Sequence, residues 1–368
     1  MSITRHLLGI SGGKDSAALA IYMKTKYPEI EMEYYTSDTG RELKETYQLI
    51  DNLEVFLGKK ITRLAAVEDS PELPFDHFLK MYGGFLPSSN ARWCTKKLKL
   101  DPFEKFVNND PVISYVGIRG DEAREGYISR KLNIQSIFPF RSNIWSEDVI
   151  SKALSNENIC FLFNQCEQII EDEGKRLRFQ SILPIPLSAQ YNQALKLNSL
   201  LNCGIKEFNQ LVFSFLKTTD YPLASEETYQ LLENEDNLIR TDIFRILETS
   251  GVGVPEYYKA IPFEVNGKKA VYSRSRSGCF FCFYQQKIEW VWLYEQHQNL
   301  YEEAMEYEKD GYTWMQDESL SSLIRPERII RIKEDYIKRT ERTQKSKSPL
   351  LIDILSDAEG EGCASCFI

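Results

Sequence analysis

The chain reads Ser11-Gly12-Gly13-Lys14-Asp15-Ser16 directly after a short apolar run at 7–10 and before an alanine- and leucine-rich segment at 17–23. This order predicts a buried strand, a tight glycine turn and the start of a helix. Backbone N–H groups, the helix N-terminus and the Lys14 ammonium then face one spot, which favours a tetrahedral polyanion. We therefore expect residues 11–16 to hold phosphate groups.

The spacing is not that of the Walker loop, which places four residues between its first glycine and the Gly-Lys pair. The string resembles instead the PP-loop of ATP pyrophosphatases, enzymes that split ATP into AMP and pyrophosphate while adenylating a substrate. An ordinary glycine turn between a strand and a helix is the alternative. The complete six-residue string favours the PP-loop.

The composition is typical of a globular protein. A chain of 368 residues can bury a full core and is expected to form one large domain and a smaller one. No apolar run is long enough to cross a bilayer, and the first strand begins almost at the N-terminus, so we expect a cytoplasmic protein with no membrane partner. The net charge of −9 argues against nucleic-acid binding by the whole surface. The basic stretch 325–347 is interpreted as a solvated helix face, with nucleic-acid contact as the alternative.

Strand-like and helical patterns alternate over residues 6–120, which predicts an α/β fold with a doubly wound, mostly parallel sheet, similar to that of adenine nucleotide alpha hydrolases. We expect strands at 6–11, 31–37, 61–66 and 112–118, helices at 14–27, 41–58 and 95–108, and a loop-rich passage at 69–92. Four regions are predicted: a PP-loop nucleotide-binding domain at 1–150, a helical insertion or lid at 151–253, a cysteine-bearing helical region at 254–342, and a flexible tail at 343–368.

The second predicted strand ends at Asp38-Thr39-Gly40. Ligands of open α/β sheets sit beyond the carboxyl ends of the strands, so this turn should lie beside residues 11–16. A simple turn-and-cap role is the alternative. The string is similar to the nucleotide-contacting turn of the phosphoadenosine phosphosulfate (PAPS) reductase branch of the PP-loop superfamily, and this resemblance implies that Asp38, Thr39 and Gly40 bind nucleotide.

Three further segments resemble the same branch: Cys94 followed by the basic residues 95–99, the pattern Gly117-x-Arg119…Glu122…Arg124, and the Pro…Trp…Asp-Val passage at 137–149. The resemblance covers about 1–155 and resumes near 254–315, whereas 156–250 matches no family that we can name. It implies that Arg119 and Arg124 bind substrate phosphate and act in catalysis with Lys14 and Asp15.

Charge and ligand type support this interpretation. Arginine suits a bidentate grip on phosphate or sulfate, and Lys96 and Lys99 add point charges to Arg119 and Arg124. Scattered surface charges are the alternative. Asp15 and Asp38 offer the hard oxygen ligands that suit Mg²⁺.

The eight cysteines stand at 94, 160, 166, 203, 279, 282, 363 and 366. Two Cys-x-x-Cys pairs in a cytosolic enzyme point to metal or sulfur chemistry rather than disulfides. Cys279 and Cys282 on one turn, with Cys94 as third ligand, predict a metal or cluster site, and buried unliganded cysteines are the alternative. The residue types suit zinc and iron–sulfur equally.

The family resemblance favours a [4Fe–4S] cluster over zinc. Cys203 is the first candidate for a fourth ligand, with Cys160 and Cys166 as alternatives. A three-cysteine cluster with one open iron that holds sulfide, as in related RNA-thiolating enzymes, is equally compatible. Cys363 and Cys366 could carry persulfide or resolve a disulfide, or belong to a dispensable tail.

The complete PP-loop distinguishes two enzyme classes, because sulfonucleotide reductases carry a degraded loop. It favours an ATP-dependent adenylating sulfurtransferase, and the motif order most resembles DNA phosphorothioation enzymes, which implies DNA and a cysteine desulfurase as partners. A phosphoadenosine or adenosine phosphosulfate reductase is one alternative. The other is a nucleotide-sensing subunit of a defence complex.

Overall fold

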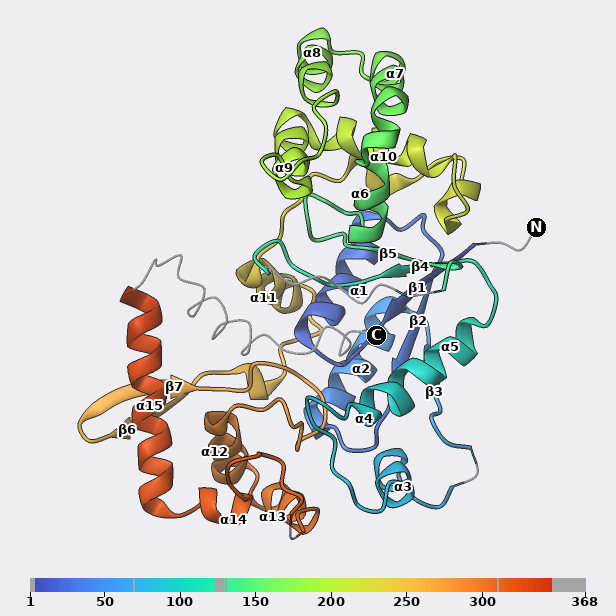
Figure 1. Ribbon diagram of the computed structural model, residues 1–368. Coiled ribbons are helices and arrows are strands. Elements are labelled where there is room, and N and C mark those ends of the chain that lie inside the picture. Colours follow the sequence, from blue (N-terminus) through green and yellow to red (C-terminus); the bar gives the residue numbers. More distant parts are fainter. Residues whose placement is uncertain (1–3, 69, 123–128, 130, 310, 346–368) are drawn as a thin grey trace.

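The computed structural model describes residues 4–68, 70–122, 129, 131–309 and 311–345, with the side chains described as far as residue 341 (Figure 1). Within these residues a parallel sheet lies at the centre. A helical region (147–249) extends from one end of the sheet, and a C-terminal region (256–345) packs at the other end.

The central sheet contains five parallel strands in the order β3-β2-β1-β4-β5. The strands are β1 (Arg5–Gly9), β2 (Met32–Ser37), β3 (Ile61–Leu64), β4 (Val112–Tyr115) and β5 (Ile134–Ile137). β1 lies in the middle and pairs with β2 on one side and β4 on the other, so the strand order reverses beside it. In an open α/β sheet, this switch point is where ligands bind.

Helices cover both faces of the sheet, because the strands are apolar on both. α1 (Lys14–Lys26) and α2 (Lys44–Leu57) pack on one face and α5 (Asp101–Val107) packs on the other, whereas α3 (Pro74–Met81), α4 (Trp93–Thr95) and the π-helix η1 (Lys96–Leu100) contribute to a second core. Leu8 of β1 joins the core beneath α1 and α2, whereas its neighbour Leu7 packs with Phe103 and Val107 of α5 on the opposite face. This arrangement confirms the predicted doubly wound fold.

A helical region follows β5, and most of it forms the upper part of Figure 1, while its last helix lies beside α1. It contains α6 (Glu147–Ala153), η2 (Asn156–Asn158), α7 (Ile159–Ile169), α8 (Glu173–Ile182), α9 (Gln193–Cys203), α10 (Ile205–Leu216), η3 (Pro222–Ser225), η4 (Gln230–Glu233) and α11 (Arg240–Thr249). Its buried side chains continue the core of the α1 face of the sheet, and a buried hydrogen bond runs from Trp145 Nε1 to Asn209 Oδ1 over 3.0 Å. The region is therefore packed as an extension of that face.

The C-terminal region packs against α3 and the loops at the carboxyl ends of the strands. It contains η5 (Glu256–Tyr258), β6 (Ile261–Val265), β7 (Lys268–Tyr272), α12 (Lys287–Gln296), α13 (Gln298–Glu306), α14 (Leu320–Leu323) and α15 (Pro326–Lys345). A second core joins Phe75 of α3 to Trp290 of α12. The hairpin β6–β7 turns at Asn266-Gly267, whose φ values of 48° and 75° are those that a tight two-residue turn requires.

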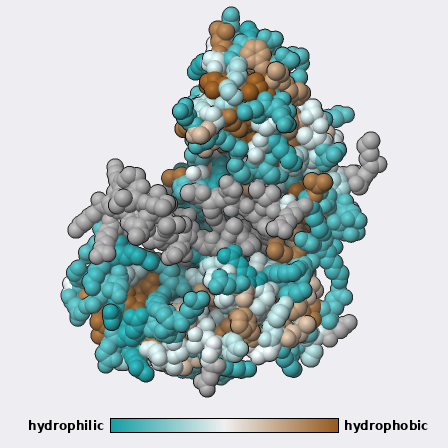
Figure 2. All heavy atoms as spheres, viewed as in Figure 1, coloured by the Kyte–Doolittle hydropathy of each residue, from teal (hydrophilic) through white to brown (hydrophobic). Residues whose placement is uncertain are grey.

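Figure 2 shows mostly hydrophilic residues on the visible face, with small groups of apolar residues over the helical region and near the hairpin. Among the described helices, none combines the length and apolarity that crossing a membrane would require.

The four predicted strands and the helical character of 150–250 are confirmed, although β4 ends at Tyr115 rather than at residue 118. Three elements differ from the expectation. α3 lies inside the passage 69–92 that we expected to be mainly loop, because Pro74 occupies the first turn of a helix, where it breaks no hydrogen bond. β5 and the β6–β7 hairpin were not predicted as strands. The four domain boundaries stay a prediction.

Candidate functional site

The loop 11–16 lies where β1 ends and α1 begins, at the switch point of the sheet. Gly12 has φ +70°, and a Cβ there would come within 2.2 Å of the Thr46 methyl carbon. Gly13 precedes the helix, and a Cβ at this position would meet the hydroxyl of Ser277 at 2.6 Å. Both glycines are required here, because the turn is left-handed at the first and closely covered at the second.

Serine hydroxyls fix the shape of the loop. The backbone N–H of Ser11 donates to Ser16 Oγ over 3.2 Å, and Ser16 Oγ donates to the carbonyl of Gly13 over 3.2 Å. These bonds tie the end of β1 to the first turn of α1. The backbone donors of the turn are thereby held near the helix N-terminus, where an anion is stabilised.

Three buried charges meet at the start of α1. Lys14 Nζ lies 2.9 Å from Asp15 Oδ2, and Arg119 Nη1 lies 2.8 Å from Asp15 Oδ1. Burial alone would raise the pKa of Asp15, but the two cations outweigh it and lower this pKa below its ordinary value. Asp15 is therefore a carboxylate that orients one cation from its own helix and one from the loop after β4.

Arg119 contacts three carboxylates. It bonds Asp15, and it also reaches Asp121 over 2.8 Å and Glu122 over 2.5 Å. Burial lowers the pKa of Arg119, but Asp15 and Glu122 raise it further, so the net shift is upward. In this state the guanidinium is engaged by protein groups, and phosphate contact by Arg119 stays a prediction. Arg124 lies outside the described residues.

The second predicted turn lies beside the loop. Asp38 Oδ1 accepts a bond from the N–H of Gly40 over 2.8 Å and one from the Tyr47 hydroxyl over 2.9 Å. The Thr39 hydroxyl donates to Glu42 Oε1 over 2.6 Å. The turn is thus held by its own side chains.

Asp15 and Asp38 supply oxygen atoms of the type that Mg²⁺ prefers. Both carboxylates are already engaged, however: Asp15 by Lys14 and Arg119, and Asp38 by hydrogen-bond donors. In this state they do not form a carboxylate pair open to a cation, and Mg²⁺ binding stays a prediction.

Cys279 lies against the Asp38 turn although it is distant in sequence. Residue 279 forms an antiparallel bridge with Glu42, and the N–H of Phe280 donates to the carbonyl of Arg41 over 2.9 Å. The Cys279 sulfur lies 3.1 Å from the Thr39 hydroxyl. A predicted cysteine and a predicted nucleotide contact are therefore in direct contact.

Cys282 lies close enough to Cys94 and to Cys279 to act on the pKa of both thiols. Burial raises the pKa of Cys94 to about 12, and the neighbouring Cys282 adds to this shift. Burial also raises the pKa of Cys279, again with a contribution from Cys282, while Lys99 lowers both values. Lys99 lies in the π-helix η1, directly after Cys94, and such irregular turns are frequent at functional sites.

The other cysteines lie elsewhere or outside the described residues. Cys203, predicted as a fourth ligand, ends α9 and packs in the core of the helical region, which also contains Cys166. Cys160 is exposed on α7. Cys363 and Cys366 are outside the described residues. Within the described part of the chain, no three His, Cys, Asp or Glu side chains form a group that could hold a metal ion.

Sequence reasoning missed Tyr257 and Tyr258, which contact the loop from the C-terminal region as Ser277 does, and it predicted no contact for Arg274 with a backbone carbonyl. The Tyr257 hydroxyl donates to the Gly12 carbonyl over 3.0 Å, and the Tyr258 hydroxyl accepts the N–H of Lys14 over 3.3 Å. Ser277 Oγ lies 3.4 Å from the Ser11 carbonyl. Arg274 is fully buried, and its Nη2 donates to the carbonyl of Cys279 over 3.2 Å. The only local signal was the Ser-Arg-Ser-Arg-Ser run before Cys279.

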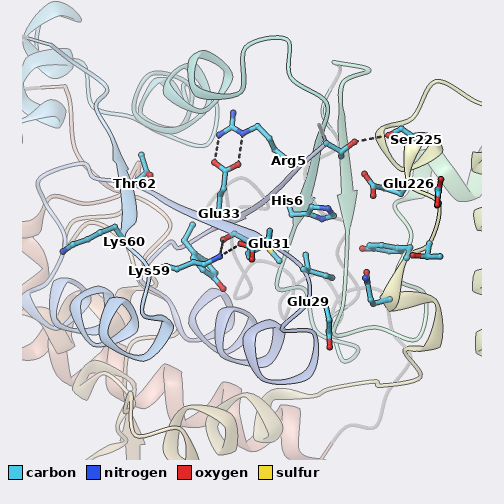
Figure 3. Close-up of a pocket in the computed structure, with 18 residues that line it drawn as sticks. Arg5, His6, Glu29, Glu31, Glu33, Lys59, Lys60, Thr62, Ser225 and Glu226 are labelled. Carbon is cyan, nitrogen blue, oxygen red and sulfur yellow. Dashed lines mark hydrogen bonds and ion pairs between the residues drawn. The ribbon is translucent and has the colours of Figure 1, made fainter. Parts of the chain in front are cut away.

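Two of the cavities lined by described residues differ greatly in size. A cavity of about 800 Å³ opens at the opposite edge, where β1 and β2 begin, and is lined by charged residues that include Arg5, Glu31, Glu33 and Lys59 (Figure 3). Beside the loop 11–16, a cavity lined by Ser11, Ser37, Asp38, Glu42, Lys99 and Gly278 among others has a volume of only about 20 Å³.

The geometry thus joins a phosphate-type loop, the Asp38 turn and Arg119 at one edge of the sheet. The segment 5–159, which contains all three, matches the family model of the phosphoadenosine phosphosulfate reductase domain. Residues 5–159 thus form a PAPS reductase-type domain. The PAPS reductase domain places this part of the chain in the PP-loop superfamily, whose members are nucleotide-binding enzymes.

A curated relative is the uncharacterized protein MJ0066 of Methanocaldococcus jannaschii, which is 32% identical over 166 residues. The match covers 41% of this chain and 32% of the relative, so it spans about a third of that protein. No solved structure matches the chain. The family match ends before α8, and Cys279, Cys282 and the tyrosines of η5 lie outside it.

Proposed function

We propose that the protein is an ATP-dependent adenylating sulfurtransferase that splits ATP into AMP and pyrophosphate and inserts sulfur into a nucleic acid. The DNA backbone, modified to a phosphorothioate, is the first candidate acceptor. The observation that carries the proposal is the complete loop 11–16 at the switch point of the sheet, with Cys279 in contact with the neighbouring Asp38 turn.

The loop supplies what an attack at the α-phosphorus of ATP needs. An acceptor oxygen forms a bond to that phosphorus, the bond to the bridging oxygen breaks, and pyrophosphate leaves with its electron pair. Backbone N–H groups and the Lys14 ammonium stabilise the negative charge on the phosphates. Asp15 acts as a positioning residue, since it orients both Lys14 and Arg119.

Three cysteines are the proposed ligands of a cluster or metal that takes part in the sulfur transfer. Cys94, Cys279 and Cys282 are soft ligand types, and we propose that together they would hold a [4Fe–4S] cluster, or zinc, once their side chains turn toward a common centre. A cluster bound there would deliver or relay sulfur next to the nucleotide, and a cysteine desulfurase is the proposed source of that sulfur. The contact between Cys279 and Thr39 supports this neighbourhood of sulfur and nucleotide.

A PAPS or adenosine phosphosulfate reductase is the second candidate, favoured by the name of the matching domain family. The two functions differ in their products. A sulfurtransferase forms AMP and pyrophosphate from ATP, whereas a reductase releases sulfite from a sulfonucleotide and leaves ATP intact.

The test uses the full chain, purified without oxygen and incubated with α-labelled ATP, with and without DNA. We expect AMP and pyrophosphate in equal amounts from the wild type, and none from Lys14→Ala. Lys60→Ala, which removes a lysine that is 90% exposed at its side chain, serves as the matched control and should keep full activity. Sulfite from PAPS without AMP from ATP would replace the proposal with the reductase. ATP binding without either product would indicate a nucleotide sensor.

A further inference from the structure

Tyr258 contacts the loop 11–16, which is called the phosphate loop below. The N–H of Lys14, the first residue of α1, donates to the hydroxyl of Tyr258 over 3.3 Å. This N–H is one of the free donors that a helix N-terminus offers to an anion. Tyr258 is buried and lies in η5, separated from Lys14 by 244 positions. A residue of the C-terminal region thus takes a position that a phosphate oxygen would need.

The side chain of Lys14 is engaged as well. Its Nζ pairs with Asp15 over 2.9 Å and lies 5.2 Å from the centre of the Tyr258 ring. Lys14 is only 6% exposed, and Asp15 is only 3% exposed. Tyr258 therefore contacts both the backbone donor and the ammonium through which the loop would bind a polyanion.

One cavity lined by described residues adjoins the loop 11–16. The adjoining cavity of about 20 Å³ has room for roughly one water molecule, whereas small-molecule sites measure roughly 300–1,000 Å³. The buried Ser37 hydroxyl, which lines this cavity, has no hydrogen-bond partner. A buried hydroxyl without a partner calls for an explanation, and a polar group that it would bind in this cavity is one.

The turn that carries Tyr258 is anchored at defined points. The Tyr257 hydroxyl donates to the Gly12 carbonyl over 3.0 Å, and the Tyr257 carbonyl accepts the N–H of Arg274 over 2.9 Å. The Arg274 guanidinium lies 6.0 Å from the Tyr257 ring centre and 5.9 Å from that of Trp292. These contacts hold η5 against the loop as one element.

We infer that Tyr258 is a gate over the phosphate loop, and that nucleotide can bind only when η5 moves away and releases the N–H of Lys14. The inference rests on the proposed function, because it assumes that the loop binds a nucleotide. The free protein then exists mainly in the closed state, and its apparent affinity for nucleotide is reduced by the fraction of molecules that are closed.

The test compares ATP and inorganic pyrophosphate binding to the full chain and to Tyr258→Phe by calorimetry. The phenylalanine ring fills the same space but cannot accept the N–H of Lys14. We expect Tyr258→Phe to bind both ligands about 3- to 10-fold more tightly, which corresponds to the loss of one buried hydrogen bond from the closed state alone. A hydroxyl that contacts the bound nucleotide would have the opposite effect on affinity.

Tyr229→Phe is the matched control. Tyr229 is equally buried, and its hydroxyl bonds that of Tyr115, away from the loop. We expect this variant to bind like the wild type, and a thermal melt of each variant confirms that it is folded. If the wild type binds ATP and Tyr258→Phe binds it with the same or a weaker affinity, Tyr258 is not a gate, and the proposed function still stands. Absence of ATP binding in all three folded proteins would overturn both.

Discussion

Asp15 Oδ1 lies 2.8 Å from Arg119 Nη1, and this buried ion pair joins the start of α1 to the loop that follows β4. The two residues are separated by 104 positions in the sequence. The pair also fixes the other oxygen of Asp15 toward Lys14. The conformation of the phosphate loop (residues 11–16) therefore depends on Arg119, which lies in the loop after β4.

Removing the Arg119 charge should destabilise the fold strongly. Arg119→Ala removes the guanidinium that pairs with the buried carboxylates of Asp15 and Glu122, while Lys14 still pairs with Asp15. Breaking a buried pair costs about 3–5 kcal/mol of unfolding free energy. Urea unfolding measures this cost. Arg245→Ala, which breaks a pair whose arginine is 70% exposed, should change the unfolding free energy by less than about 1 kcal/mol. Equal effects of the two substitutions would contradict the role of the buried pair.

The Asp15 carboxylate should make stability depend on acid pH. Its pKa in the folded protein is below the ordinary value of 3.8, because Lys14 and Arg119 outweigh burial. A lowered folded pKa contributes stability that is present above the unfolded value and is lost as the pH falls through the folded one. The stability difference between wild type and Asp15→Asn should therefore be full near neutral pH and shrink below about pH 4. Urea unfolding at several pH values measures it, and a constant difference would argue against an ionised Asp15.

Part of this arrangement could be predicted from local sequence. The string 11–16 between an apolar run and an alanine-rich segment places the loop correctly, because a glycine turn at the end of a buried strand is a local property. The β6–β7 hairpin could also have been predicted, since Asn266-Gly267 is the strongest two-residue turn signal. α3 was hidden by Pro74, which marks a break within a helix but a favourable start at its first turn.

The contacts of the C-terminal region with the loop could not be predicted. Tyr258 has no motif around it, and its contact with Lys14 depends on how η5 packs after 244 intervening positions. Cys279 was predicted as a ligand from its spacing to Cys282, but its contact with Thr39 depends on the bridge to residue 42. Tertiary placement, rather than residue type, decides such contacts.

Substitution of Gly12 tests how closely the Thr46 side chain packs against the turn 11–13. Gly12 and Gly267 have similar positive φ values, +70° and +75°, so replacing either with alanine imposes the same backbone strain. Only at Gly12 would the new Cβ also meet a side chain, the Thr46 methyl at 2.2 Å, whereas nothing lies within 4 Å of the Cβ at Gly267. We expect Gly12→Ala to lower the unfolding free energy by about 1–3 kcal/mol more than Gly267→Ala. Equal losses would show that the turn has room for a side chain.

The cysteine group gives the prediction that bears most directly on sulfur chemistry. If Cys94, Cys279 and Cys282 hold a metal or cluster, replacing any one with serine should remove most of the bound iron or zinc, because serine is a poor ligand for soft metals. Metal analysis and visible absorption of anaerobically purified protein measure the loss. Cys160→Ser, at an exposed position on α7, is the control and should keep the wild-type content.

Cys203→Ser separates a three-cysteine site from a four-cysteine site. Cys203 packs in the core of the helical region, whereas Cys94 and Cys279 pack at the edge of the second core, with α3 and α12. A thiol held in a different core reaches the group only if the two cores separate, which would expose apolar surface at a cost of about 25 cal/mol per Å². We therefore expect Cys203→Ser to keep its iron or zinc while Cys279→Ser loses it. Loss in both variants would assign Cys203 as a ligand, and retention in both would exclude the cysteine group as the metal site.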